Sequence, residues 1–435
     1  MKYIKSCAAA LLALAAVQAA SAQTTIRVTG STAFRSATIA GIKSLLGSTY
    51  DEVYQVSSSS TTGSTNSNFT TFVGTYSGNS VIIQCAWTGS AEGIRDVAQG
   101  LNQKFIKSSY VVNNTPGTIE TASTTSASSD TSVFESGIPE IAMADNTQAA
   151  TIFKTPALTQ TAVGIIPFVF VKGQVAAGHP SKTAFDSVTN ITSQMAKAVY
   201  AGGAPLSFFT GATADSSTYI YGLGRNPFSG TRIVTFAETG IGSTSTATQF
   251  TPTTTSTNIT GMSLTVADTT NGFTSGNNGY SSGGTLVGDL YKPVSDTDGS
   301  GNAQDGVPFG LIGYVGVSDA ATMLKSINAG SGTDTSAVLS YNGVRLVPTY
   351  SSSGQSTTWD YTPLKEGKYS FWSVAYLSYR KSSGANGTTA ISGLPKTFAD
   401  GLATYIIGNV PSSSGVKLAD MKVTRTTEGG AISLK

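Results

Sequence analysis

The chain has 435 residues, more than one hydrophobic core usually serves, so its length predicts two domains or one domain with large insertions. Charged residues make up only 11% of it, whereas Ser and Thr supply about 28%, so the surface is polar through hydroxyl and amide groups. A formal net charge of +2 argues against nucleic-acid and acidic-membrane partners, because such binding needs clustered Lys and Arg. One His and two Cys exclude a zinc site of the usual Cys/His kind.

The first 22 residues have the pattern of a secretory signal peptide. Lys2 and Lys5 form a charged start, residues 8–20 an apolar stretch, and Ala22 ends an AxA-type cleavage site. The apolar stretch is too short for a membrane helix, so we expect a soluble protein in the periplasm or outside the cell. We also expect it to be a monomer. Cleavage near Ala22 would reduce the net charge from +2 to 0 and leave Cys85 without a disulfide partner.

Short apolar runs alternate with amphipathic helical patterns along the chain, which predicts an α/β fold with mostly parallel sheets. The expected strands are residues 26–28, 81–86 and 163–171. The expected helices bury Ile39, Ile42 and Leu46; Ile94, Val97, Leu101 and Phe105; and Ile191, Met195, Ala198 and Val199. Between these blocks lie four stretches rich in Ser, Thr, Gly and Asn, which we interpret as surface insertions or loops with some short strands: residues 56–71, 113–131, 243–284 and 351–358.

One local design recurs where an expected strand leads into an expected helix. Residues 30–34 (GSTAF) and 89–93 (GSAEG) place small and hydroxylic residues at a helix start, and Arg225 precedes Ser-Gly-Thr at 229–231 by four residues. Free N–H groups and the positive end of the helix dipole accept an anion at such positions. A single GSTAF or GSAEG can equally be a helix cap with a tight turn, Arg225 a surface residue, and Asp145 a turn residue. Their order along the chain carries more information than any one of them.

In that order the motifs resemble the phosphate-binding periplasmic proteins of ABC transporters, within the type 2 periplasmic-binding superfamily. The matching segments are IRVTGSTAFRSA, IIQCAWTGSAEGIRDV, IAMAD, VGIIPFVFVKG, NITSQMAKAVYAGG, LGRNPFSGT, GLIGYVGVSDA and PLKEGKYSFWSVAYLSY. The resemblance implies a PBP-like domain: two lobes, each a mostly parallel sheet flanked by helices, that close over a small anion and engage a membrane permease. It places lobe 1 at residues 23–160 plus 320–435, and lobe 2 at 161–319 with the insertion around 243–284.

The resemblance also implies which residues bind the oxyanion, expected to be phosphate. The implied donors are Thr32, Ala33, Phe34, Ser90, Arg225, Ser229, Gly230 and Thr231. Asp145 is the implied carboxylate facing the anion. A buried carboxylate only accepts hydrogen bonds, so it suits an oxyanion that carries a proton and repels sulfate.

Two departures from the family pattern leave alternatives open. The first loop is about one residue shorter than the commonest forms, so the donors among residues 31–33 are not fixed. Glu92 lies in a loop that usually holds small residues; pointing outward it permits phosphate, whereas pointing inward it would favour another or a cationic ligand. Together with the long insertions, Glu92 motivates an alternative function: a secreted or surface-associated interaction protein that keeps the fold but binds a larger ligand or a matrix partner.

Catalysis, cofactors and metals have little support in the sequence. His179 lies in a loop, where we expect it to be solvated and without a nucleophile partner, so we expect no enzyme and no cofactor. Asp296, Asp298 and Ser300 follow the first half of a calcium loop. Position twelve of that loop is Val307 and not the bidentate Glu, so a polar turn is the favoured interpretation.

Overall fold

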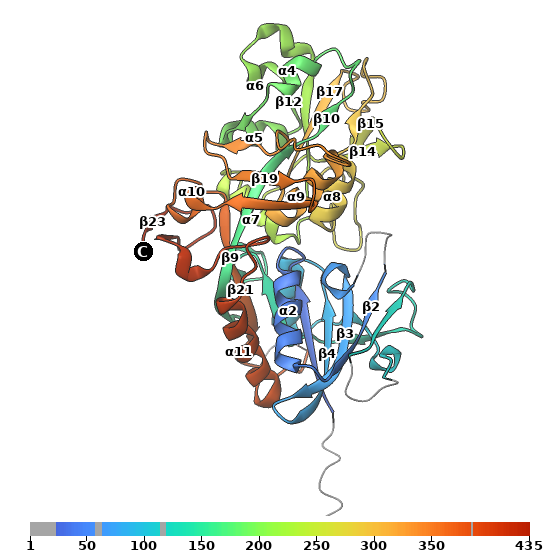
Figure 1. The fold of residues 1–435 in the computed structure, drawn as a ribbon, viewed down its shortest axis with the longest axis vertical. Helices are drawn as coiled ribbons and strands as arrows, with labels where there is room; N and C mark the ends of the chain where they lie inside the picture. The colour runs from blue at the N-terminus through green and yellow to red at the C-terminus, as the bar shows by residue number, and fades with distance from the viewer. Residues whose placement is uncertain (1–22, 57–62, 114–118, 384–385) are drawn as a thin grey trace, which may run out of the picture.

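The computed structural model describes residues 23–56, 63–113, 119–383 and 386–435, so the expected signal peptide lies outside the described residues. It confirms the α/β class: an 11-stranded sheet runs through the molecule, with helices on its faces (Figure 1). The strands in spatial order are β12 (Ala204–Pro205), β13 (Tyr219–Leu223), β17 (Phe309–Gly316), β9 (Leu158–Lys172), β21 (Trp372–Arg380), β8 (Ile141–Ala144), β1 (Thr24–Gly30), β4 (Asn79–Ala86), β3 (Phe69–Tyr76), β2 (Tyr50–Gln55) and β6 (Thr121–Thr124).

The remaining elements are helices and small sheets. The helices are α2 (Arg35–Leu46), α3 (Ser90–Gln99), α4 (Lys182–Asp186), α5 (Ser193–Tyr200), α6 (Ser207–Thr210), α7 (Gly230–Glu238), α8 (Gly283–Leu290), α9 (Val317–Ile327), α10 (Thr362–Lys365) and α11 (Gly393–Gly408). A four-stranded sheet joins β10 (Gln174–Val175), β16 (Pro293–Val294), β15 (Ile259–Leu264) and β14 (Phe250–Thr254). The two-stranded sheets are β11 (Asn190–Ile191) with β18 (Ser340–Tyr341), β19 (Val347–Ser351) with β20 (Ser356–Asp360), β22 (Val423–Thr424) with β23 (Ser433–Leu434), and β5 (Gln103–Ile106) with β7 (Phe134–Gly137).

The long strand β9 divides the sheet into two lobes. Residues 158–167 of β9 pair with β21, and residues 168–172 pair with β17. We call the part from β21 to β6 the first lobe and the part from β17 to β12 the second lobe; Figure 1 shows them below and above the middle of the molecule. Residues 163–172 are buried, which explains the unbroken apolar run in the sequence.

The direction of the strands places the loops that concern function. The sheet is mixed: β1 pairs in parallel with β4 and β8, and β13 with β17, whereas the flanking pairs β2–β3, β3–β4, β9–β17 and β9–β21 are antiparallel. Because the carboxyl ends of parallel strands meet at one edge, the loops after β1, β4 and β8 lie together at the end of the first lobe. The loop after β13 and the start of α9 after β17 are placed in the same way in the second lobe.

Two of the expected helices begin or end elsewhere than the apolar spacing indicated. The helix expected to reach Phe105 ends at Gln99, because Gly100 adopts the left-handed conformation with φ of 65°, and Phe105 lies in β5. The helix expected to include Ile191 begins at Ser193, where the Thr192 side chain accepts a hydrogen bond from the N–H of Met195. In both segments apolar residues of a strand continued the helical spacing by coincidence.

The residue at which the chain returns from the second lobe to the first stays a prediction. α9 packs against α8, and β18 pairs with β11, so residues 317–341 contact second-lobe elements. β21 and α11 belong to the first lobe, where α11 packs against α2. The boundary at residue 320 therefore stays a prediction.

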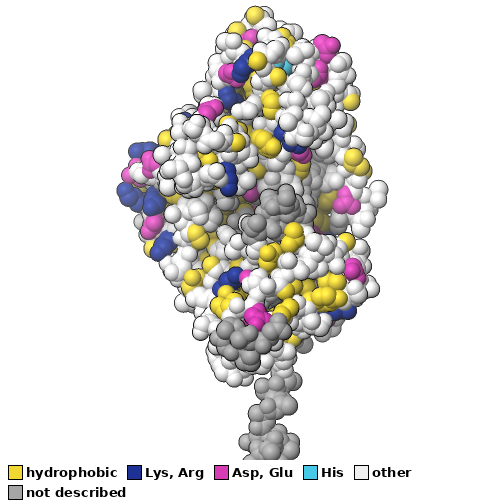
Figure 2. All heavy atoms as spheres, turned by 45° about the vertical axis from the view of Figure 1, so that its right-hand side comes forward, with side chains coloured by type: hydrophobic (Ala, Val, Ile, Leu, Met, Phe, Trp, Pro, Cys, Tyr) yellow, Lys and Arg dark blue, Asp and Glu magenta, His cyan; other side chains and the backbone are white. Residues whose placement is uncertain are grey.

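The surface matches the low charge of the sequence. On the face drawn in Figure 2, most atoms are uncharged; Lys and Arg side chains gather beside Asp and Glu at the left edge and are otherwise scattered. Among the described residues, no helix is both long enough and apolar enough to cross a membrane.

The C-terminal segment ties the two lobes together through buried polar contacts. Arg425 forms an ion pair with Glu238 of α7 at 2.9 Å, with side-chain exposures of 3% and 7%, and its guanidinium lies 4.1 Å from the centre of the Trp372 ring. Three residues on, Glu428 accepts hydrogen bonds from the N–H (2.6 Å) and hydroxyl (3.0 Å) of Thr147 in the first lobe.

Removal of one partner of this buried ion pair should destabilise the fold. Glu238→Ala leaves Arg425 as an uncompensated buried charge, so we expect the free energy of unfolding to fall by about 3 kcal/mol or more. In the surface pair Lys182–Asp186 the side chains are 41% and 52% exposed, so Asp186→Ala should cost no more than about 1 kcal/mol. Denaturant unfolding measures both, and equal small losses would contradict the structural role of the pair.

Candidate functional site

The loop after β1 is organised around the Ser31 hydroxyl. Its oxygen accepts hydrogen bonds from the N–H groups of Ala33 (3.1 Å) and Phe34 (3.3 Å), and its hydrogen is donated to the Asp145 carboxylate. Gly30 has φ of 119°, and a Cβ there would clash with the carbonyl of Met143. Ser31 therefore orders the loop and holds Asp145. Thr32, the next residue of this described loop, makes no such contact within it.

The loop after β4 packs directly on the first. The Gly89 N–H donates to the Gly30 carbonyl at 2.9 Å, and Gly93 of α3 lies against the Cα of Gly30. The Ser90 hydroxyl accepts a hydrogen bond from the N–H of Asp145 at 3.0 Å. Glycine at these positions lets two helix starts and one carboxylate share a small volume.

The guanidinium of Arg225, which follows β13 in the second lobe, is held by carbonyl groups. Its Nε donates to the Tyr280 carbonyl at 3.1 Å and its Nη2 to the Ser281 carbonyl at 2.7 Å. Both carbonyls come from the 243–284 stretch, which we expected to be a surface insertion. The stretch thus positions the predicted ligand arginine, and sequence reasoning missed this because backbone carbonyls have no residue signature.

The backbone of Arg225 is fixed as firmly as its side chain. Its N–H donates to the Tyr314 hydroxyl at 3.0 Å. Its carbonyl accepts from Arg232 and from Gln249, each at 3.1 Å. An arginine restrained at both ends loses little conformational entropy when it binds an anion.

The start of α7 brings the second lobe against the first. Ser229 caps the helix by accepting from the N–H of Arg232, and Gly230 and Thr231 form the first turn, whose N–H groups have no acceptor within the helix. Gly230 lies against the Ser90 hydroxyl of the first lobe. Beside this contact the Ala91 N–H donates to the Phe228 carbonyl at 2.9 Å, so the two lobes touch at two helix starts.

Charged side chains of both signs meet at this junction. Burial raises the pKa of Asp145 to about 6, against the opposing effects of the Ser31 hydrogen bond and of Arg225. Burial lowers the pKa of Arg225, opposed chiefly by Asp319 at the start of α9. Burial also raises the pKa of Asp319, while Arg225 and Arg35 oppose the shift. Two carboxylates and two arginines therefore leave no large net charge before a ligand arrives.

Glu92 takes no part in this junction. Its carboxylate accepts from Arg95 at 3.0 Å and from Gln103 at 3.3 Å, along the outer side of α3. Arg95 in turn lies 4.7 Å from the centre of the Phe228 ring. Of the two orientations left open by the sequence, the structure has the one that permits an anion.

Most of the predicted site residues lie in the loops and helix starts that meet at this junction. The residues whose contacts place them there are Ala33, Phe34, Ser90, Asp145, Arg225, Ser229, Gly230 and Thr231. Thr32 lies in the same loop, between Ser31 and Ala33. Donors from helix starts, one arginine and one carboxylate can hold a small oxyanion that carries at least one proton. Two neighbours were not predicted: Asn146, next to Asp145, and Asp319, which lies within the GLIGYVGVSDA motif and had a signal in the sequence.

The other constellations lie outside this junction. Both carboxylate oxygens of Asp296 accept backbone N–H groups, from Gly299 and Gly301, and Asp298 accepts from Ser300. Across the described ranges, no group of three or more His, Cys, Asp and Glu residues could hold a metal ion. The expectation that His179 is solvated is wrong: it is 4% exposed, because its loop folds back so that its ring accepts from the Ser181 N–H.

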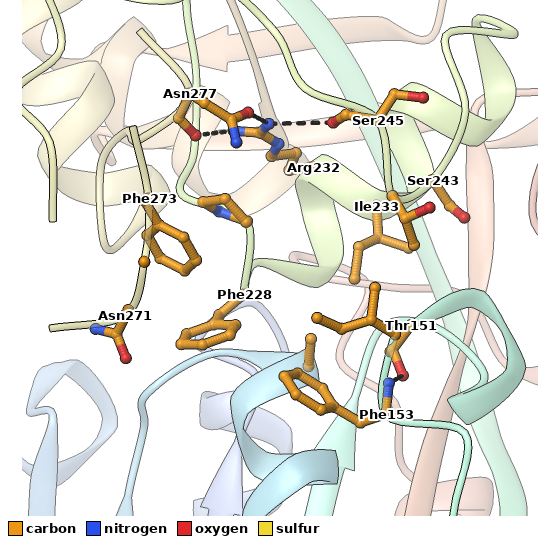
Figure 3. A pocket seen from close by; sticks show the side chains of 15 residues that line it. Thr151, Phe153, Phe228, Arg232, Ile233, Ser243, Ser245, Asn271, Phe273 and Asn277 are labelled. Atoms are coloured by element: carbon orange, nitrogen blue, oxygen red, sulfur yellow. Dashed lines mark hydrogen bonds between the residues drawn. The ribbon is translucent and has the colours of Figure 1, made fainter. Parts of the chain in front are cut away.

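A pocket of about 240 Å³ opens between the lobes beside α3 and α7 (Figure 3). The rings of Phe153, Phe228 and Phe273 lie along one side, and Arg232 with Asn277 along the other. Arg232 is committed to the carbonyl of Asn277 at 2.8 Å. The pocket is part of the interface between the lobes, and its aromatic wall packs α7 against the first lobe.

Neither protein-family sequence models nor curated proteins match the chain. It is similar to a solved putative phosphate ABC transporter substrate-binding protein with bound phosphate from Clostridium perfringens, with 13% identity, a TM-score of 0.40, and 91% of this chain and 100% of that chain covered. For a possible phosphate binding protein from Planctomyces limnophilus DSM 3776 these values are 11%, 0.34, 89% and 99%. For a DING protein they are 13%, 0.37, 90% and 91%. The identities are too low to extend a ligand from these proteins to this chain.

The raised pKa of Asp145 should make it a source of instability in the ligand-free protein. Its folded pKa of about 6 lies above the ordinary 3.8, so the folded chain binds more protons than the unfolded chain between these values, and stability falls as pH rises through them. Asp145→Asn escapes this loss and should be more stable than the wild type by about 3 kcal/mol at neutral pH, with little difference near pH 4. Denaturant unfolding at both pH values measures this; a difference independent of pH would contradict it.

Proposed function

We propose that the protein binds a small oxyanion, phosphate, between its two lobes and delivers it to an ABC transporter permease. The observation that carries the proposal is the position of Asp145. It is 2% exposed, held by Ser31 and Ser90, and electrostatically coupled to Arg225 across the junction. A buried carboxylate among anion donors has a use when the anion itself supplies a hydrogen.

Phosphate fits this combination better than sulfate does. Near neutral pH a phosphate oxyanion carries at least one hydrogen that it can donate to Asp145, whereas sulfate carries none and would set two acceptors against each other. The helix starts at Ser90 and Gly230 and the Arg225 guanidinium satisfy the unprotonated oxygens. No cluster of surface cations is needed, which agrees with the low charge of the chain.

The proposed mechanism is closure of the lobes around the ligand. Asp145 and Ser90 belong to the first lobe, and Arg225 and Gly230 to the second, so an anion between them favours the arrangement in which the lobes touch. β9 runs from one lobe into the other and is the element about which the lobes would move. A permease would recognise the closed arrangement.

Loss of the arginine should abolish the proposed binding without unfolding the chain. Arg225→Ala removes the cation that is coupled to Asp145 across the junction, so we expect the affinity for phosphate to fall by at least about a hundredfold, as for a buried charged hydrogen bond. Arg345→Ala is a matched control, because Arg345 is also bonded to carbonyl groups, those of Thr335 and Val338. Calorimetry with unchanged affinity for Arg225→Ala would refute the assignment.

Loss of the carboxylate charge should change selectivity more than affinity. In Asp145→Asn an amide replaces the acceptor-only group, so sulfate no longer meets a buried negative charge, and the preference for phosphate over sulfate should shrink by about tenfold or more. Asp51→Asn is the control, since Asp51 is a buried carboxylate of β2 that accepts a hydrogen bond from the Glu120 N–H at 2.8 Å. Equal selectivity in the wild type and Asp145→Asn would remove this role.

A further inference from the structure

Asn146 carries a buried side-chain oxygen that no described residue of the chain hydrogen-bonds. The residue is 0% exposed and directly follows Asp145 at the end of β8. Its Nδ2 donates to the Thr147 carbonyl at 2.8 Å, while its Oδ1 has no hydrogen-bond partner among the described residues. Buried polar atoms are nearly always paired, so this oxygen points to a missing donor.

The orientation of this amide is fixed by its neighbours. Exchanging Oδ1 and Nδ2 would place the side-chain oxygen against the carbonyl oxygen of Thr147, two acceptors that repel each other. Thr147 cannot easily turn away, since Glu428 accepts from its N–H at 2.6 Å and from its hydroxyl at 3.0 Å. The unpaired atom is therefore an acceptor.

The unpaired oxygen lies beside Gly230 and Ser90, two residues of the proposed oxyanion site. A Cβ added to Gly230 would lie 2.8 Å from Asn146 Oδ1 and would clash with the Ser90 hydroxyl, so Asn146, Ser90 and Gly230 meet closely at the start of α7. Ser90 also accepts from the Asp145 N–H. The site thus has two acceptors, Asp145 and Asn146, among its donors.

We propose that Asn146 Oδ1 accepts a second hydrogen from the ligand, so that the site selects an oxyanion with two hydrogens, the dihydrogen form of phosphate. The inference rests on the proposed function and adds the protonation state of its ligand. Monohydrogen phosphate has one hydrogen, which satisfies Asp145 and leaves Asn146 unpaired. Dihydrogen phosphate satisfies both acceptors and carries one charge for Arg225 to balance.

Two acceptors predict a distinctive dependence of affinity on pH. The bound state holds two protons between Asp145 and the ligand. With the pKa of Asp145 at about 6 and the second pKa of phosphoryl oxyanions at about 6 to 7, affinity should peak between them and fall on both sides. With Asp145 as the one acceptor, the bound state holds a single proton, and affinity would instead rise to a plateau above the second pKa of the ligand.

Other charged groups around the two acceptors are accounted for. Arg225 and Asp319 act on Asp145 from the second lobe, and Arg35 acts on Asp319. Glu428 reaches Asn146 only through Thr147. The proposed profile is therefore assigned to Asp145 and the ligand, and Asn146 itself does not ionise.

Calorimetric titration of the wild type and Asn146→Leu with inorganic phosphate, from about pH 5 to about pH 9, tests the proposal. In the wild type the affinity should fall about tenfold per pH unit above the second pKa of phosphate, and in Asn146→Leu this fall should disappear. Asn328→Leu is the control: its buried amide is satisfied, with Oδ1 accepting from the Asp334 N–H at 2.6 Å, so the profile should stay that of the wild type. A plateau in both the wild type and Asn146→Leu would overturn the role of Asn146, whereas absence of phosphate binding at every pH would overturn the proposed function itself.

A second measurement uses the wild type alone and does not depend on the folding of a variant. The methylphosphonate monoanion has a methyl group in place of one hydroxyl, so it donates to Asp145 and leaves Asn146 unpaired. Near pH 6 phosphate should bind at least about tenfold more tightly than methylphosphonate. Equal affinities would contradict the second acceptor.

Discussion

The arrangement of the site depends on one constraint, the burial of the Asp145 carboxylate. Desolvation raises its pKa to about 6, and Ser31, Ser90 and Arg225 are placed so that the charged form can still exist. Ser31 is committed to this task and also orders the loop that starts α2. Under the proposed function, this group costs stability in the free protein and becomes favourable when the ligand donates a hydrogen to it.

The fold converges on this group through strand direction. The parallel strands β1, β4 and β8 end at one edge of the first lobe, and β13 and β17 end facing them in the second. β9 belongs to both lobes, so they are two halves of one sheet and not two separate sheets joined by linkers. The C-terminal segment, through Arg425 and Glu428, adds a second connection between the lobes.

The sequence was sufficient for the α/β class and for the junction loops, because both follow from local patterns: apolar runs, glycine with hydroxyl residues, and Arg225 four positions before Ser229. It could not reveal contacts made by backbone atoms far along the chain, such as the Tyr280 and Ser281 carbonyls that hold Arg225. Nor could it predict the orientation of Glu92, or that Asn146 Oδ1 has no hydrogen-bond partner among the described residues, since both depend on packing in three dimensions. The Phe105 and Ile191 errors arose where strand residues continued a helical spacing.

The most direct test of the account is a calorimetric titration of the chain from residue 23 onward with a panel of oxyanions, including phosphate and sulfate, near neutral pH. The account predicts one phosphate bound per chain and no measurable heat with sulfate at the same concentration, because only phosphate brings a hydrogen to Asp145. Absence of heat with every oxyanion, or equal affinity for phosphate and sulfate, would contradict an anion site built around a buried carboxylate.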